Sequence, residues 1–266
     1  MDVARERWSE AFDSTTGASL YDHTIDVISL RRQERRAVMR TLLPSTTLDS
    51  YRILELGAGT GVFTENLAAS FPQARVVAVD GAKSMLKIAA AKEFLKENKN
   101  RIELPLADYT TPVWKKQVTG SFDFVTSVDA LHHLDHRRVR SLYEEVYDII
   151  ALGGKILIAD HISSGGSFQQ EPQYDLWIDE TRSNLKSLDR GTDAVKAIEN
   201  LFGWTYDDLQ QLTALELKGR LTEALQSEGE NPMCLMSHVD ALRDAGFIDV
   251  AVEYRFGNFA IVSAAK

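Results

Sequence analysis

The chain has 266 residues, 44% hydrophobic and 26% charged, with a formal net charge of −9, which fits one large soluble domain with or without an insertion. The acidic balance argues against a nucleic-acid partner, and the absence of an apolar run near the roughly 20 residues that cross a bilayer argues against a membrane partner. The N-terminus lacks the apolar core of a signal peptide and Cys234 is the only cysteine, so we expect a cytoplasmic protein without disulfides.

Residues 1–43 are expected to form a helical cap in two pieces. The first piece carries Trp8 and Phe12, and a polar break at residues 14–17 separates it from a longer helix over residues 22–43. The apolar side of this second helix holds Ile25, Ile28, Met39 and Leu43, and the arginines expected mostly on its outer side are Arg31, Arg32, Arg35 and Arg36. We interpret these arginines as a solvated face rather than an RNA-binding one, because the surrounding chain is acidic.

A short apolar strand at residues 51–56 runs into a glycine-rich turn that opens a helix. The turn reads Gly57-Ala58-Gly59-Thr60-Gly61, and Glu55 interrupts the strand just before it. Three glycines at alternate positions leave backbone against which a ligand can lie. A second strand at 75–80 ends in Asp80, about 20 residues past the turn, where nucleotide-binding sheets hold ribose hydroxyls. The two features together predict an adenosine-type cofactor.

The spacing of the glycines narrows the choice of cofactor. The dinucleotide pattern is GxGxxG, whereas here the glycines fall as GxGxG, and a carboxylate before them would repel a pyrophosphate but attract an amino group. Residues Glu55 to Gly61 resemble the first motif, E/D-x-G-x-G-x-G, of the class I S-adenosylmethionine-dependent methyltransferases. The same spacing of the glycines disfavours an NAD-dependent oxidoreductase. The alternative to a cofactor site is an ordinary strand–turn–helix whose glycines serve only tight packing.

Strands and helices alternate from residue 51 to 161, which is typical of a parallel sheet covered on both faces. Near the C-terminus, a tight connection at Gly257-Asn258 makes the last two strands antiparallel neighbours. We predict a doubly wound, Rossmann-like α/β fold with a seven-stranded, mostly parallel sheet and an antiparallel last strand. The cofactor-binding core would comprise 44–161 and 237–266, with strands at 51–56, 75–80, 101–106, 122–127, 154–160, 248–255 and 259–265, and helices near 60–70, 83–97 and 136–151.

An insertion over residues 162–236 separates the two parts of this core and carries 13 acidic and 6 basic residues. It reads as helical, and its aromatic residues include Tyr174, Trp177, Trp204 and Tyr206. The insertion leaves the sheet at the carboxyl end of the fifth strand, which is the ligand-binding edge of open α/β folds. We therefore predict a lid over the substrate. A dimerisation element is the alternative, and both a monomer and a homodimer stay open.

The resemblance to the methyltransferases assigns the cofactor residues. Glu55 would anchor the methionine end, and Asp80 would accept both ribose hydroxyls. Gly81 would leave room for the adenine, and Met85 would pack on its face. Tyr21 would reach over the cofactor's carboxylate or over the substrate. The loop residues expected beneath the methionine and ribose are Gly57, Ala58, Gly59 and Gly61.

The third and fourth strands end in further candidates. After the third strand comes Ala107-Asp108-Tyr109, in which Asp108 would take the adenine amino group; a turn or helix cap is the commoner role of such an Asp. After the fourth strand, Ser127 and Val128 would line the methionine moiety, and the stretch from Asp129 to His133 would border the transferred methyl group. The A-L-H-H-L turn in that stretch resembles the small-molecule branch of the family, and the N/D-P-P-Y motif of enzymes acting on nucleobases or glutamine is missing from the sequence.

Histidine is the usual general base near neutral pH, and two histidines are our candidates. His133 lies in the turn after the fourth strand, and His161 follows Asp160 at the end of the fifth. Structural hydrogen bonding, or a reaction that uses no base, is the alternative. His132 and His136 are four residues apart, as in some metal sites, but a loop pair before a helix cap is commoner, and we predict no metal.

The sequence therefore predicts a cytoplasmic S-adenosylmethionine-dependent methyltransferase that acts on a small molecule and releases S-adenosylhomocysteine. A methyltransferase of protein side chains is the alternative among enzymes. A cofactor-binding, non-catalytic regulatory subunit is the alternative outside them.

Overall fold

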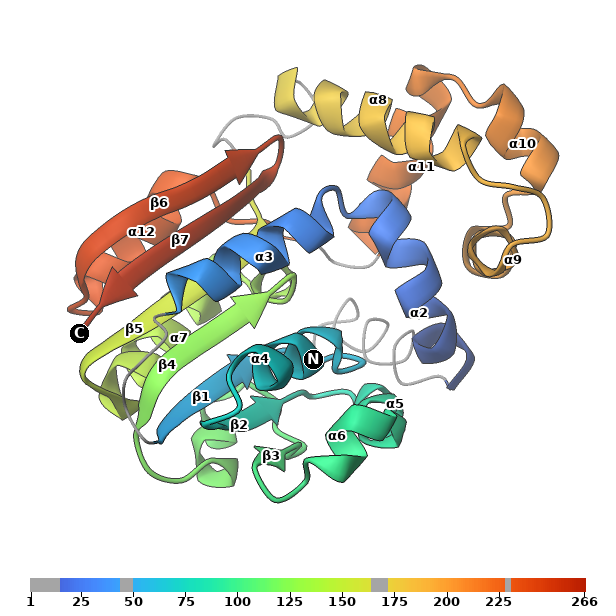
Figure 1. Ribbon diagram of the computed structural model, residues 1–266. Helices are drawn as coiled ribbons and strands as arrows, with labels where there is room; N and C mark the ends of the chain where they lie inside the picture. Colours follow the sequence, from blue (N-terminus) through green and yellow to red (C-terminus); the bar gives the residue numbers. More distant parts are fainter. Residues whose placement is uncertain (1–14, 44–49, 164–171, 228–230) are drawn as a thin grey trace. The chain divides into compact units, whose positions relative to one another are not determined.

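The computed structural model describes residues 15–43, 50–163, 172–227 and 231–266, which form two compact units (Figure 1). One unit is helical and combines the chain up to Arg32 with the insertion. The other is built around the sheet and combines residues 33–165 with residues 231–266. Within the described ranges, no helix is both long enough and apolar enough to cross a membrane.

The sheet has seven strands in the order β3-β2-β1-β4-β5-β7-β6. Their bounds are β1(Tyr51–Leu56), β2(Ala74–Val79), β3(Ile102–Glu103), β4(Phe122–Val128), β5(Ile150–His161), β6(Ile248–Phe256) and β7(Phe259–Ala265). The first five strands pair in parallel, and β7 lies antiparallel between β5 and β6. The predicted fold class is confirmed, including the antiparallel last strand.

The order of the strands reverses between β1 and β4. The chain moves outward from β1 through β2 to β3, then returns to place β4 on the other side of β1. Helices on either side of such a reversal leave a crevice at the carboxyl ends of the two central strands. Both strands are almost wholly buried, which explains why their sequences are mostly apolar and do not alternate regularly between apolar and polar residues.

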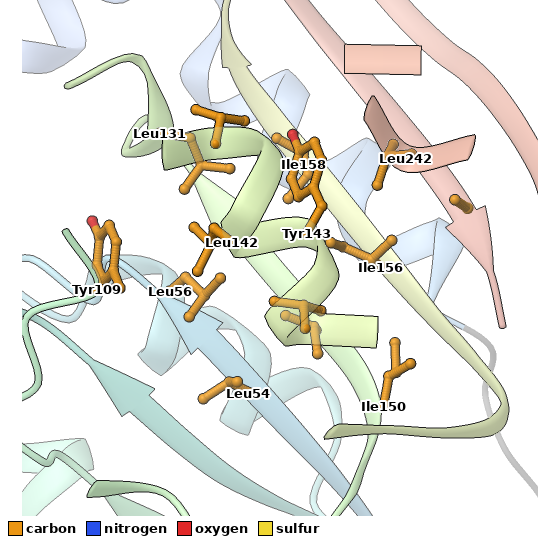
Figure 2. Packing of buried hydrophobic residues seen from close by; sticks show 14 of the residues in the cluster. Leu54, Leu56, Tyr109, Leu131, Leu142, Tyr143, Ile150, Ile156, Ile158 and Leu242 are labelled. Atoms are coloured by element: carbon orange, nitrogen blue, oxygen red, sulfur yellow. The ribbon is translucent and has the colours of Figure 1, made fainter. Parts of the chain in front are cut away.

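Helices cover both faces of the sheet. One face carries α3(Arg32–Leu42), α4(Val62–Ser70), α5(Lys83–Ala91) and α6(Glu93–Glu97). The other carries η1(Pro112–Gln117), α7(His136–Ile149) and α12(Leu235–Asp244). Figure 2 shows Leu142 and Tyr143 of α7 packed among Leu56 of β1 and Ile156 and Ile158 of β5.

The predicted bounds of the strands and helices agree with the structure at the centre of the sheet and agree less well near β3. The third strand is paired over only two residues, with an isolated bridge between Asp80 and Leu106 beyond it. The helix expected over 83–97 is interrupted at Lys92, which has extended backbone angles. Local patterns do not reveal such interruptions, because lysine is compatible with a helix interior.

The N-terminal helices differ from the expectation. Trp8 and Phe12 lie outside the described residues. The expected break at 14–17 falls largely within α2(Thr15–Ile28), and the expected long helix is interrupted at Arg31, whose φ is 53°. Contacts of α2 with α8 and α9 stabilise it despite weak local helix signals. As a result, α2 belongs to the helical unit and α3 to the sheet unit, instead of both forming one cap.

The expectation that the arginines of this region are mostly exposed is wrong for two of them. The side chain of Arg35 is fully buried and that of Arg36 is 6% exposed. A helical-face pattern cannot anticipate this, because the reason for burial is an ion-pair partner, Asp129, that is 94 residues away in the sequence.

The helical unit also contains α8(Pro172–Lys186), α9(Asp193–Phe202), α10(Tyr206–Gln211) and α11(Ala214–Ser227). Three of the aromatic residues singled out in the insertion, Tyr174, Trp177 and Trp204, are buried within this unit. The indole Nε1 of Trp177 donates a hydrogen bond to the carbonyl of Ile28 (2.8 Å), which joins α8 to α2. These aromatic side chains therefore form the core of the unit.

Replacing Leu142 by Ala tests the importance of the core between α7 and the sheet. This side chain is fully buried, so the Leu142→Ala variant should lose about 2–5 kcal/mol of unfolding free energy in urea denaturation. The same substitution at Leu152, which is 91% exposed, provides the control and should change it by less than about 0.5 kcal/mol. Equal losses at both positions would contradict this description of the core.

Candidate functional site

The glycine turn lies at the carboxyl end of β1, where the strand order reverses between β1 and β4. The backbone N–H groups of Gly57 and Ala58 both donate to the carbonyl of Val79 at the end of β2 (2.9 Å each). Gly61, with φ 80°, is the N-cap residue of α4. The turn is therefore fixed to the second strand before the helix begins.

The three glycines of the turn have different surroundings. A Cβ on Gly57 would come within 2.4 Å of the Ala130 Cβ, and one on Gly61 would come within 2.8 Å of the Ala89 Cβ. At Gly59, no atom of the described residues other than its chain neighbours lies within 4 Å of the Cβ position. All three have positive φ. Two of the glycines thus serve protein packing, and only Gly59 has open space on that side, where a ligand can approach the backbone.

Asp80 connects the glycine turn to the turn after β2. One carboxylate oxygen accepts the N–H of Gly59 (2.7 Å), and the other accepts the N–H of Ala82 (2.8 Å). The side chain is largely buried, and this burial raises its pKa, while the backbone donors act in the opposite direction. Each carboxylate oxygen has a second lone pair, so Asp80 can hold the turn and still accept hydroxyl groups.

The turns after β2 and β3 are adjacent. The N–H of Ala107 donates to the carbonyl of Asp80 (2.9 Å), and Asp108 lies 3.6 Å from the Cβ position of Gly81. The Asp108 carboxylate accepts the N–H of Thr110 (2.9 Å) and is itself exposed. The structure therefore brings together the residues expected around the ribose and adenine: Asp80, Gly81, Ala107 and Asp108. Met85 and Tyr109 are buried nearby in sequence, on α5 and after β3.

Glu55 does not have the surroundings of a ligand-facing carboxylate. Its side chain is 1% exposed, and the hydroxyl of Thr64 on α4 donates to its Oε2 (2.6 Å). Burial raises its pKa to about 8, although the hydrogen bond from Thr64 lowers it. The carboxyl group therefore lies beneath the turn, where it connects β1 to the start of α4.

The end of β4 holds the other predicted cofactor residues. Ser127 is fully buried, and its hydroxyl donates to the carbonyl of Leu56 (3.0 Å), so it joins β4 to β1. Val128 is largely buried as well. Asp129 adopts φ 51°, an unusual angle for a residue other than glycine, and forms a two-contact ion pair with Arg35 (2.5 and 3.3 Å). The Arg35 guanidinium also lies 4.2 Å from the centre of the Phe259 ring.

A histidine cluster follows at the same edge of the sheet. Nδ1 of His132, in the short helix η2(Leu131–His133), lies 2.5 Å from Oδ1 of Asp160. Asp160 also accepts the N–H groups of Leu131 and His161 (2.7 Å each). The rings of His132 and His133 are 3.9 Å apart, and the His161 ring stacks on Phe259 at 5.1 Å.

The two histidines predicted as bases both lie beside His132, whose Nδ1 faces the Asp160 carboxylate. Burial and the neighbouring His132 and His161 hold the pKa of His133 well below its usual value. Within the described ranges, no group of three or more His, Cys, Asp or Glu residues is arranged to hold a metal ion. Tyr21 belongs to the helical unit, where its ring lies 5.6 Å from the Arg32 guanidinium, and its reach toward the cofactor stays a prediction.

Comparison with known proteins identifies the domain. Residues 53–154 match a family model described as a methyltransferase domain. The structure of phosphoethanolamine N-methyltransferase 2 from Haemonchus contortus, in complex with S-adenosyl-L-methionine, superposes with a TM-score of 0.63 at 16% identity, covering 100% of this chain and 60% of that one. Residues 53–154 therefore match a methyltransferase domain, and the chain has the fold of this S-adenosyl-L-methionine-bound structure.

The curated relatives that this chain matches include proteins named malonyl-[acyl-carrier protein] O-methyltransferase. One from Bacillus anthracis is 30% identical over 99 residues, covering 36% of this chain and 34% of the relative. One from Ilyobacter polytropus is 24% identical over 197 residues, covering 74% of this chain and 65% of the relative. The matched part is thus less than two thirds of either relative. S-adenosylmethionine is the cofactor of the family.

Sequence reasoning missed three residues of the site. Arg35 is expected to be mostly exposed, His132 is expected only within the stretch bordering the methyl group or in a disfavoured metal pair, and Asp160 enters only as the neighbour of His161. Side chains alternate between the two faces of a strand, so Asp160 and His161 in β5 point to opposite faces. This alternation in the sequence indicates that the two residues have different surroundings. Nothing local pointed to Arg35.

Paired glycine variants of the protein test the assignment of the turn. The Gly59→Ala variant should fold, losing about 1–2 kcal/mol of stability for its positive φ, but should bind S-adenosylhomocysteine at least about tenfold more weakly in calorimetric titration. The Gly57→Ala variant should lose more stability, because it adds the 2.4 Å clash with Ala130. A Gly59→Ala variant with unchanged affinity would show that no ligand lies against this backbone.

The raised pKa of Glu55 predicts a pH dependence of stability. Between pH 4.5 and about 8 the folded protein keeps a proton on Glu55 that the unfolded chain has released, so raising the pH favours unfolding. The Glu55→Gln variant should remove this contribution, which is at most about 1.4 kcal/mol per pH unit, from urea denaturation curves between pH 5 and 8. The exposed Glu97→Gln variant is the control and should keep the wild-type slope.

Proposed function

We propose that the protein transfers a methyl group from S-adenosylmethionine to a small-molecule acceptor. The observation that carries the proposal is the open backbone of Gly59 beside the Asp80 carboxylate, at the edge of the sheet where the strand order reverses. A side chain at Gly59 would occupy this space, and the acidic group beside it suits ribose hydroxyls. The residues present therefore fit the cofactor of the family.

Asp80 would accept the ribose hydroxyls through its remaining lone pairs, and the exposed Gly81 and Asp108 would border the adenine. Met85, Ala107 and Tyr109 would line the adenine side of the cofactor site. Val128 would line the methionine side. The buried Glu55 and Ser127 would act by supporting the turn. When bound, the cofactor supplies an activated methyl group, so the protein has to orient the acceptor and exclude water.

The acceptor is proposed to be a small molecule, in line with the histidine turn and with relatives named for O-methylation of a malonyl group. The insertion is proposed as a substrate lid, although its aromatic core serves its own stability. A protein side chain is the alternative acceptor, and a cofactor-binding regulatory subunit is the alternative role. A cytoplasmic location is part of the proposal, and a monomer and a homodimer are both compatible with it.

Calorimetric titration with S-adenosylhomocysteine tests the proposal. The wild-type protein should bind one equivalent, and the Asp80→Asn variant should bind at least about tenfold more weakly, because an amide has lost one acceptor and the charge. The Asp123→Asn variant is the matched control, since Asp123 also accepts a backbone N–H, from Arg52 (2.8 Å), at the opposite edge of the sheet. Wild-type protein without measurable binding would refute the proposed function.

A further inference from the structure

The turn after β3 receives little support from the sheet itself. β3 is paired with β2 over only two residues, and an isolated bridge then joins Leu106 to Asp80. The N–H of Ala107 donates to the carbonyl of Asp80 (2.9 Å). Asp108, which we propose as the acceptor of the adenine amino group, follows directly. The position of its carboxylate therefore depends on how the chain beyond the strand is held.

Arg138 of α7 holds the segment that follows Asp108. Its Nε donates to the carbonyl of Tyr109 (2.8 Å), and a terminal nitrogen lies 3.5 Å from the carbonyl of Thr111. The two terminal nitrogens donate to the two carboxylate oxygens of Glu145 (2.8 and 2.6 Å). Because the guanidinium is planar, a paired contact with a carboxylate also fixes the direction of its remaining donor. Arg138 therefore determines where the backbone of this turn lies.

Glu145 is held from a second direction. The indole Nε1 of the buried Trp114 donates to the same carboxylate oxygen, Oε2, that Arg138 contacts (2.6 Å). Burial raises the pKa of Glu145, but the hydrogen bonds from Arg138 and Trp114 outweigh it and bring this pKa below its usual value. Glu145 is thus ionised at pH 7. The Arg138 and Glu145 side chains are only 11% and 12% exposed, so water screens this paired contact less than an ion pair on the surface.

The inner side of the same turn faces the glycine residues of the candidate site. The Tyr109 hydroxyl lies 3.0 Å from the Cβ position of Gly57, and the Asp108 backbone lies 3.6 Å from that of Gly81. The exposed Asp108 carboxylate accepts the N–H of Thr110 (2.9 Å), so its direction follows the backbone of the turn. Loss of the contact at the Tyr109 carbonyl would therefore let Asp108 move relative to Gly81.

We propose that Arg138 is a positioning residue for recognition of the adenine ring. The inference rests on the proposed function and deepens it, because it concerns which purine the cofactor site accepts. Arg138 keeps Asp108 in the place from which the carboxylate accepts the amino group of adenine. A 6-oxo purine presents an acceptor oxygen instead, which a carboxylate repels. The choice between the two purines thus depends on how firmly α7 holds the turn after β3.

Calorimetric titration of the full chain with S-adenosylhomocysteine and with its 6-oxo analogue, S-inosylhomocysteine, measures this choice as a ratio of two Kd values. The wild-type protein should prefer the amino compound at least about tenfold, because the oxo compound loses a hydrogen bond to a charged group. The Arg138→Gln variant should reduce the preference to less than about threefold. The Arg138→Lys variant should lie between the two, since lysine keeps the charge but lacks the planar fork.

Arg140→Gln is the matched control. Arg140 belongs to the same helix and pairs with Asp244 of α12 (3.1 Å), so the same substitution removes an ion pair of α7 away from the turn. Its ratio of Kd values should equal that of the wild-type protein. Glu145→Gln is a second variant, which weakens the hold on Arg138 and should lower the preference as well. A wild-type ratio in Arg138→Gln, or in Glu145→Gln should Arg138→Gln not fold, would overturn the inference.

The Asp108→Asn variant distinguishes positioning from a general loss of stability. An asparagine amide can donate to an oxo group, so this variant should lose the preference for the amino compound. Adding Arg138→Gln should then leave the ratio unchanged, because the carboxylate that Arg138 positions is gone. A further change in the double variant would contradict the proposed route through Asp108. Wild-type protein that binds neither compound refutes the proposed function, whereas binding of both without a preference refutes only the inference about Arg138.

Discussion

Four carboxyl groups lie buried at one edge of a single sheet, and the molecule has to compensate each of them for lost water. It does so in four ways. Glu55 keeps a proton and accepts a hydroxyl, Asp80 accepts backbone N–H groups, Asp129 binds a guanidinium, and Asp160 binds an imidazole together with two N–H groups. Each solution ties two separate chain segments together. The positions of the glycine turn, of the turn after β4 and of α3 all follow from these ties.

The same compensation separates the residues that hold structure from those that are available to a ligand. Glu55 has no exposed surface to offer, whereas Asp80 has unused lone pairs beside open backbone at Gly59. The division is not by residue type, since both residues are acids at the carboxyl ends of adjacent strands. It depends on the surroundings of each side chain, and the reversal of the strand order between β1 and β4 determines these surroundings.

Particular residues show which parts of the fold and of the site the sequence predicts and which parts it does not. The parallel strands were predictable because buried strands are continuously apolar, and the GxGxG turn was predictable because positive φ demands glycine. The proximity of Asp80 to Ala107 followed from the parallel order. The partnership of Arg35 with Asp129 did not, because it joins segments 94 residues apart and leaves no periodic trace. The contact of His132 with Asp160 depends on a ring orientation that only the folded turn defines.

The contact between Gly57 and Ala130 gives one methyl group an unusual influence. Ala130 stands between Asp129, held by Arg35, and Leu131, whose N–H is held by Asp160. Its Cβ occupies the space that a side chain at Gly57 would need. The height of the glycine turn above the sheet is therefore set from the histidine side, by the bulk of a single residue. A larger side chain at position 130 would push against the turn, so Ala130 couples the glycine turn to the turn after β4.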